Sequence, residues 1–472
     1  MRALSIILSL FLAGSVLADD WRGKKVLPKK NESDIQIHEW VDGKKVFWEA
    51  QNLLISKCNV LEDRDGLLRI FDGRREGWVV KEDFLKAEDA PVYWDKAVRA
   101  NPNDVFALRM RGVSRSQNGE FDMAIKDLTE CLKREPKSSL VYIWRGYVWI
   151  LMREYDKALL DFTEAIQLDP KVAFAYQGRG GAWYFKKEYD KAIFDLTEAI
   201  RLDPKEPSSY RGRGNSWFGK KEYDKAIADY SEAIRVIPKN SDCYICRAKA
   251  WFGKKEYDKA IADYSEAIRL DPNNPVLFQS RGDLWFLKND NDKAIVDFTE
   301  VIRLDPEHVD SYLGRGTAWI RKMEYDRAIP DFTEAIRLVP MKADMYYKRG
   351  GLWLYKAEYD KAIFDFTEAI RLNPRDSKSF CIRGFAWIRK GEYDKANVDI
   401  SEAIRLDPKS PNVHYQIACL YALTKKTDLA LESLGKALEL GWKKFQHLEE
   451  DTDLDSIRNH PRYKQLLKKY QK

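Results

Sequence analysis

The chain has 472 residues, which suggests roughly three domains at about 150 residues each. Its 81 Lys and Arg against 75 Asp and Glu leave a net charge of +6, too small and too diffuse for a dedicated nucleic-acid binder. The 44% apolar and 13% aromatic content excludes wholesale disorder, whereas 33% charged residues and a mean hydropathy of −0.54 exclude a polytopic membrane protein. Six Cys and five His are too few for a disulfide scaffold or a metal-rich protein of this length.

Residues 1–18 predict a removable export signal. An apolar run from Ala3 to Ala13 follows one positive residue and is shorter than the ~20 residues that span a bilayer. Val16 and Ala18 then place small residues at the −3 and −1 positions of a cleavage site. We therefore expect an exported protein, periplasmic or secreted, with no transmembrane segment after cleavage. A retained membrane anchor is the less favoured alternative.

Residues 19–86 predict a small all-β domain. Five β-type runs are separated by Gly, Asp and Asn: GKKVLPKK, DIQIHEWV, KVFWEA, NLLISKCNVL and EGWVVKEDFL. Five strands in about 65 residues are typical of a small barrel. Gly77-Trp78-Val79 followed by Phe84-Leu85 resembles the closing strand and turn of bacterial SH3-like domains. That resemblance implies binding of peptide or cell-wall material, and a barrel that only caps the following array is the equal alternative.

After residue 100 the sequence repeats with a period of 34 residues. Each period holds two helically spaced apolar blocks joined by a short Lys-rich turn, and a proline ends the second block, so each period predicts a pair of helices. A period of this length held over nine intervals predicts an α-solenoid. The prolines that mark it are Pro102, Pro136, Pro170, Pro204, Pro238, Pro272, Pro306, Pro340, Pro374 and Pro408.

These repeats resemble the tetratricopeptide repeat family. Position 8 is Gly in eight of nine repeats, position 20 is Ala in all nine, and position 17 is aromatic in eight. The resemblance implies a mainly α protein, a right-handed α-solenoid of helix pairs preceded by the SH3-like barrel. It divides the array into a half-repeat capping helix at 87–104, nine repeats at 105–410, a degenerate tenth at 411–444 and a helical cap at 445–472. The nine repeats start at Val105, Ser139, Ala173, Pro207, Ser241, Pro275, Val309, Ala343 and Ser377.

Other positions also recur. Trp fills position 11 in eight repeats, and we expect it to belong to a repeated core. Arg at position 7, Asp at position 23 and Glu at position 26 occur in all nine, which predicts a structural ladder of Arg bonded to both acids rather than a catalytic group. Pro330, at position 22 of the seventh repeat, predicts a late start of that helix or, less favoured, a kink.

No motif points to catalysis. The His residues lack metal-ligand spacing, and Cys243-x-x-Cys246 has no second Cys pair at metal spacing, so we expect a structural role for it. Nucleophile-elbow, phosphate-loop and dinucleotide motifs are missing from the sequence. We therefore predict no enzyme activity, no cofactor and no metal site.

Protein binding is the function that the resemblance implies, because the first helices of such pairs line a concave groove suited to an extended peptide or a partner helix. Core positions repeat, so selectivity must come from groove positions 2, 5, 9, 12 and 13, which vary. In the central repeats the candidate groove residues are Gln177, Tyr184, Phe185, Arg211, Asn215, Lys249, Gln279 and Asp283.

Arg211 and Asn215 resemble part of the carboxylate clamp of chaperone-binding relatives. Cys246, Val276 and Ser280 stand where that clamp requires other residues, so we expect an ordinary exposed pair.

Two classes of function remain. The favoured one is an exported, non-enzymatic protein-interaction scaffold whose partner the sequence does not name. The alternative is a polyanion, nucleic-acid or cell-wall binder that acts through the SH3-like domain and through Lys-rich turns such as Lys186-Lys187, Lys220-Lys221 and Lys254-Lys255. Acidic residues directly follow each Lys pair and reduce the local positive field, so nucleic acid is the less expected ligand.

Overall fold

The structure is a computed structural model that describes residues 25–28, 36–41, 44–49, 58–64, 67–71, 76–80, 84–86, 89–443 and 445–470. The chain divides into two units, residues 1–263 and 264–472. The predicted signal peptide lies outside the described residues. Within the described part, every helix is too short or too polar to cross a bilayer.

Seven strands pair as one antiparallel sheet in the order β3-β2-β6-β5-β4-β1-β7. The sequence predicted five strands, but the run at 76–85 contains two, β6 and β7. Residues 67–71, which were not predicted, form β5 between β4 and β6. The SH3-like barrel itself stays a prediction. The strands are β1 (Lys25–Pro28), β2 (Gln36–Val41), β3 (Lys44–Glu49), β4 (Cys58–Arg64), β5 (Leu67–Phe71), β6 (Glu76–Val80) and β7 (Phe84–Lys86).

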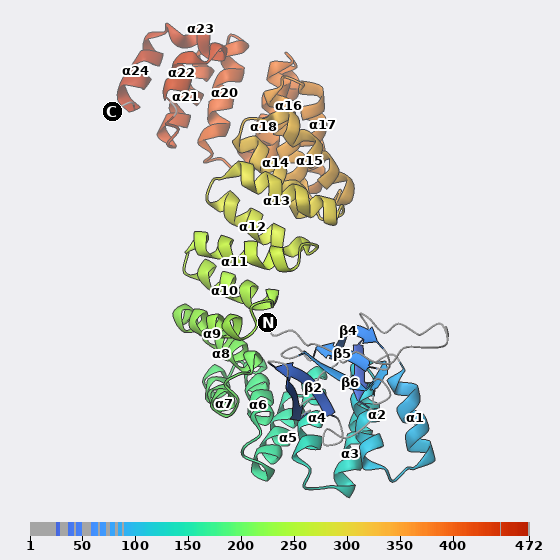
Figure 1. Ribbon diagram of the computed structural model, residues 1–472. Coiled ribbons are helices and arrows are strands. Elements are labelled where there is room, and N and C mark those ends of the chain that lie inside the picture. The colour runs from blue at the N-terminus through green and yellow to red at the C-terminus, as the bar shows by residue number, and fades with distance from the viewer. Residues whose placement is uncertain are drawn as a thin grey trace. The chain divides into compact units, whose positions relative to one another are not determined.

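Helix pairs make up the rest of the chain (Figure 1). The first helix of each pair occupies repeat positions 1–13 and the second begins at position 17. Helices of the N-terminal unit are α1 (Ala90–Ala100), α2 (Val105–Gln117), α3 (Phe121–Arg134), α4 (Ser139–Leu151), α5 (Tyr155–Leu168), α6 (Ala173–Phe185), α7 (Tyr189–Leu202), α8 (Pro207–Gly219), α9 (Tyr223–Val236) and α10 (Ser241–Gly253); the unit boundary falls inside α11 (Tyr257–Leu270).

The C-terminal unit continues the pattern and then changes to shorter helices. Its helices are α12 (Pro275–Leu287), α13 (Asn291–Leu304), α14 (Val309–Arg321), α15 (Tyr325–Leu338), α16 (Ala343–Tyr355), α17 (Tyr359–Leu372), α18 (Ser377–Arg389), α19 (Tyr393–Leu406), α20 (Pro411–Leu423), α21 (Thr427–Glu439), α22 (Phe445–Glu450), the 3-10 helix η4 (Thr452–Leu454), α23 (Asp455–Arg458) and α24 (Pro461–Tyr470).

The turn inside each pair has a fixed backbone geometry. Position 15 takes a left-handed conformation, with φ of 82° at Gly119 but also 62° at Lys187 and 55° at Ala357. The N–H of Glu188 then donates to the carbonyl of Trp183 at 3.0 Å, which closes the end of the first helix. A side chain with a Cβ is strained in this conformation, so the turn is held by its hydrogen bonds and by packing of the two helices.

The core of each pair lies between small residues and one bulky residue at position 24. Ala192, at position 20, is fully buried, and so is Phe162 at position 24. A Cβ on Gly178 would lie 2.3 Å from the Phe162 ring of the preceding repeat, so these two neighbouring pairs meet this closely because Gly178 has no side chain.

Pro330 does not delay its helix. α15 begins at Tyr325, position 17, as the second helices of the other repeats do, and Pro330 lies inside it. The predicted late start is therefore wrong. Pro330 has no N–H for the bond to Asp326, and one extra short-range bond, from the N–H of Arg327 to the carbonyl of Glu324 at 3.1 Å, tightens the first turn.

Candidate functional site

The repeated Arg at position 7 is fully engaged in the framework. In α6, Arg179 donates Nε and Nη2 to the two carboxylate oxygens of Asp195, both at 2.8 Å, and Nη1 to the hydroxyl of Thr163 in the preceding repeat at 3.3 Å. Asp195 is only 2% exposed, and this bond raises the pKa of Arg179. All nine Arg make the same paired contact with the Asp of their own repeat. The predicted ladder is confirmed for Arg and Asp.

The prediction was wrong for the Glu at position 26. Glu198 binds Arg201 on its own helix at 2.6 Å, because the two side chains are three residues apart on one exposed face. The third partner of the ladder is instead a Ser or Thr hydroxyl at position 25 of the preceding repeat, which the sequence analysis missed. That hydroxyl links each repeat to the next.

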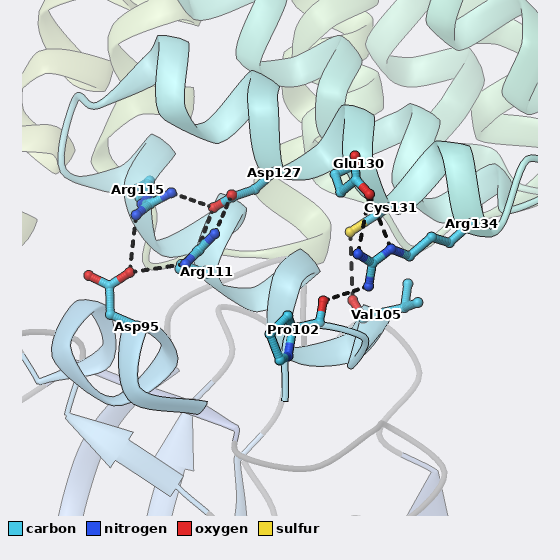
Figure 2. Close-up of polar contacts among 9 residues, drawn as sticks. All are labelled: Asp95, Pro102, Val105, Arg111, Arg115, Asp127, Glu130, Cys131 and Arg134. Carbon is cyan, nitrogen blue, oxygen red and sulfur yellow. Dashed lines mark hydrogen bonds and ion pairs between the residues drawn. The ribbon is translucent and has the colours of Figure 1, made fainter. Parts of the chain in front are cut away.

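Figure 2 shows how the ladder begins. Arg111 binds Asp127 at 2.7 Å as in other repeats, but its Nη1 is 3.4 Å from Asp95 of α1. Asp95 stands where the later repeats have their hydroxyl, and Arg115 binds both acids, at 3.0 and 2.8 Å. α1 therefore supplies the same contact as the second helix of a complete repeat.

The first lysine of each Lys pair in the turns is paired within the array. Lys220 binds Asp190 of the preceding repeat at 2.5 Å, and Lys186 and Asp156 form the equivalent contact. The lysine at position 19, in the second helix, covers the Trp at position 11, as Lys191 does 4.5 Å above the ring of Trp183. These Trp rings are half-buried and pack against the core clusters of their repeats, as Trp183 and Trp217 do, so the predicted core role is confirmed, with a cation over the exposed part of the ring.

The predicted groove residues of the N-terminal unit fall into two groups. Tyr184 and Phe185 belong to an aromatic cluster, in which Phe185 stacks on Tyr155 at 5.4 Å and remains 51% exposed. Gln177 is half-buried, and Lys249 is exposed. These side chains remain available to a ligand.

The clamp-like pair has other partners. The carbonyl oxygen of Asn215 accepts the hydroxyl of Tyr230 at 2.8 Å, which makes Asn215 part of the packing. Arg211 lies 3.4 Å from Asp242 of the next repeat. The two side chains therefore face different partners, as expected for an ordinary pair.

Gln279 and Asp283 lie together in the C-terminal unit. Gln279 donates to Asp283 at 3.0 Å and accepts from Ser311 at 2.6 Å, while burial raises the pKa of Asp283. Their role in ligand binding stays a prediction, as it does for the six groove residues of the other unit.

A cavity of about 840 Å³ lies at the last three helix pairs, a site that the sequence analysis missed. Its lining follows the predicted groove positions, but in repeats eight to ten rather than in the central ones. The varied aromatic residues at those positions were the available signal. The groove residues that line it are Tyr347, Leu354, Tyr355, Lys378, Cys381, Phe385, Arg389, Asn412, Tyr415 and Cys419, and four residues of the C-terminal segment join them, Trp442, His447, Asp451 and Asp453.

The C-terminal segment builds the end wall of this cavity. Tyr415 of α20 stacks on Trp442 at 4.3 Å, and its hydroxyl donates to Asp451. Asp451 caps η4 by accepting the N–H of Asp453 at 3.0 Å. Asp453 in turn binds Arg389 of α18 at 2.9 Å, so the wall is tied to two different helix pairs.

Burial raises the pKa values of one carboxyl group and two thiols that line this cavity. It raises the pKa of Asp453, and the charge of Asp451 raises it further. It also raises the pKa of Cys381 to about 12 and that of Cys419 well above its ordinary value, so both thiols stay protonated at neutral pH.

Cys419, Asp451 and Asp453 place three ligand-type atoms within 4.8 Å of one another. A metal ion there would have to displace the thiol proton of Cys419 and compete with the hydrogen bonds that Asp451 accepts from the hydroxyl of Tyr415 and the N–H of Asp453. The residues thus fit a hydrogen-bonded wall better than a metal centre, and the absence of a metal site stays a prediction.

Comparison with known proteins identifies the repeat. Tetratricopeptide repeat models match residues 109–173, 182–241, 241–274, 320–377 and 411–440, together just over half of the chain. The chain belongs to the tetratricopeptide repeat family. No curated protein sequence matches it.

Several solved tetratricopeptide structures are similar. YrrB, described as a tetratricopeptide protein with an unusual peptide-binding site, is 23% identical over 38% of this chain and 92% of its own, with a TM-score of 0.35. The C-terminal part of a repeat protein from Cytophaga hutchinsonii is 18% identical over 50% of this chain and 97% of its own, with a TM-score of 0.47. Yeast Tom70 is 18% identical over 82% of this chain and 96% of its own, with a TM-score of 0.32. Such values concern the fold and not the ligand.

Proposed function

We propose that this tetratricopeptide protein is an exported, non-enzymatic scaffold that binds an extended peptide segment of a partner protein in the groove of its last three repeats. The observation that carries the proposal is the cavity of about 840 Å³ at repeat positions that vary along the chain. Framework positions are occupied by their own contacts, whereas groove positions such as Tyr355 and Lys378 are exposed where they line the cavity.

The chemistry of the lining suits a peptide. Tyr347 and Phe385 offer apolar area, and Asn412, Gln416 and Ser377 offer hydrogen-bonding groups for a main chain. Sites of this kind combine apolar walls with a few polar groups that fix the direction of the ligand. Export rests on the signal pattern at residues 1–18, and fractionation with a size measurement of the processed chain tests it.

The alternative function, polyanion or cell-wall binding, is disfavoured by the pairing of the turn lysines. Lys186 and Lys220 each bind an Asp of the preceding repeat, and Lys191 covers a Trp. These contacts neutralise the first lysine of each turn and so reduce the positive field that a phosphate polymer would meet. The role of the predicted SH3-like domain stays open to either function.

The test uses a degenerate library of nine-residue peptides passed over the immobilised full-length protein. We expect the wild type to retain peptides, and Phe385→Ala to retain roughly tenfold less, since an aromatic anchor in a pocket contributes about 1.5–3 kcal/mol. The matched control is Phe194→Ala on α7, where the ring is 72% exposed and is not part of this cavity, so the substitution should not change retention.

Equal losses in both variants would contradict a groove site. Retention of heparin that disappears with salt, without retention of any peptide, would favour the polyanion alternative.

A further inference from the structure

At the end of the cavity that the C-terminal segment closes, one carboxylate oxygen of Asp453 has no hydrogen-bond partner in the described part of the chain. Asp453 is 6% exposed and lines the cavity, and its Oδ1 binds Arg389. Its Oδ2 has no hydrogen-bond partner among the described residues. This oxygen is not among the buried side-chain atoms that lack a partner, so water in the cavity reaches it and a donor of a ligand can replace that water. The neighbouring Asp451 differs, because the hydroxyl of Tyr415, the thiol of Cys419 and the N–H of Asp453 all donate to it.

Arg389 shows which kind of group the wall accepts. Its Nη1 lies 2.9 Å from Asp453, and its guanidinium carbon lies 5.9 Å from the centre of the Phe385 ring. The Arg389 side chain is 39% exposed, and its bond to Asp453 uses Oδ1 and not Oδ2. A guanidinium therefore fits this combination of carboxylate and aromatic rings.

The charges at this end favour a cation over an anion. Asp407, Asp451 and Asp453 line the cavity, and Arg389 is neutralised by one of them. Apart from His447, whose Nε2 lies 3.8 Å from Asp451, the other basic lining residue is Lys378, which lies eleven residues before Arg389 on α18, about 16 Å along the helix axis. The two cations are too far apart to hold one carboxylate together.

We propose that this acidic pocket, formed by Asp453, Asp451, Tyr415 and Trp442, takes an arginine side chain of the bound peptide. The guanidinium of the peptide donates to the free Oδ2 of Asp453 and lies against the aromatic wall. The inference rests on the proposed function and adds the chemistry of the residue that anchors the peptide.

The experiment compares three peptide pools on the immobilised full-length protein. Each pool is degenerate at eight positions, acetylated and amidated, and has Arg, citrulline or Glu fixed at its centre. Citrulline keeps the shape of arginine and lacks its charge. We expect roughly tenfold greater retention of the Arg pool than of the citrulline pool, as a charge-assisted hydrogen bond to a buried carboxylate contributes about 1.5–3 kcal/mol.

Two variants, one of them with a matched control, test whether Asp453 causes the preference for the Arg pool. Asp453→Asn should remove the preference for Arg while the pools are still retained, and the matched control Asp394→Asn, at an exposed acid on α19, should leave the preference unchanged. Arg389→Gln frees the second oxygen of Asp453, so it should increase retention of the Arg pool several-fold. This gain cannot come from a loss of folding.

Equal retention of the Arg and citrulline pools would overturn the inference and leave the proposed function standing. A fall in Arg-pool retention on Arg389→Gln, or a preference for Glu that this variant abolishes, would also overturn it. Retention of no pool would overturn both proposals.

Discussion

The Arg–Asp ladder should stabilise the array, and Arg349→Met tests this in the eighth repeat. Arg349 donates to Asp365 at 2.8 and 2.7 Å and to the hydroxyl of Thr333 at 3.1 Å. The side chains of Arg349 and Asp365 are 14% and 1% exposed, so water cannot replace the lost partner. Methionine keeps most of the apolar stem of arginine and removes only the charged group.

The expected loss in the free energy of unfolding comes from the carboxylate of Asp365, which the substitution leaves without its partner. Breaking one partner of a buried ion pair costs about 3–5 kcal/mol, because the remaining charge is unpaired. Burial already raises the pKa of Asp365, so Asp365 can take up a proton in the variant and limit the penalty. We expect a loss near 3 kcal/mol, the lower end of that ~3–5 kcal/mol range, at pH 7 and a smaller loss at pH 5.

The control substitution is Arg371→Met in the same repeat. Arg371 binds Glu368 at 2.8 Å, but their side chains are 56% and 25% exposed, and such a pair contributes only about 0.3–0.5 kcal/mol. Hydrogen exchange of the α16 and α17 amides reads out local opening, which suits a repeat array better than one global transition. If the two variants differ by less than about 0.5 kcal/mol, the ladder does not stabilise the array as argued.

Three further predictions concern stability. Gly178→Ala should destabilise the protein by about 1–3 kcal/mol because the new Cβ clashes with the Phe162 ring. Gly181→Ala in the same helix should stabilise it by up to ~1 kcal/mol, because the new Cβ there would have no atom within 4 Å. Urea unfolding of the two variants measures the difference. Ala357→Gly should raise the midpoint of thermal unfolding, because glycine relieves about 1 kcal/mol of the backbone strain that a residue with a Cβ has at φ 55°. An unchanged or lower midpoint would contradict this. The raised pKa of Asp453 means that the folded chain takes up its proton at a higher pH than the unfolded chain does. The free energy of unfolding of the wild type should therefore rise relative to Asp453→Asn as pH falls from 7 to about 4, and urea midpoints at the two pH values measure the change.

The sequence by itself determined the repeat and much of its internal chemistry. A proline every 34 residues, with Gly at position 8 and Ala at position 20, leaves few ways to pack two helices, and the helix pairs follow that spacing. The ladder of Arg and Asp was predictable because both residues recur in every repeat, and recurrence indicates a contact that each repeat needs.

Local rules failed where a contact depended on the neighbouring repeat. The hydroxyl at position 25 recurs but was not assigned to the ladder, because its partner lies in the next repeat, whereas Glu198 binds along its own helix. Pro330 illustrates the same limit, since packing holds α15 helical through a residue that its own backbone disfavours.

Only the tertiary structure decided where the groove is closed and what lines its end. Asp451 and Asp453 follow a degenerate last repeat and have no repeated counterpart, so spacing could not place them beside Tyr415 or Arg389. The contact between Tyr415 and Asp451 joins residues that are 36 positions apart in the chain, and the contact between Arg389 and Asp453 joins residues that are 64 positions apart. It depends on how the final helices fold back to cover the apolar face that the last repeat would otherwise expose, which is a property of the assembled array and not of any one period.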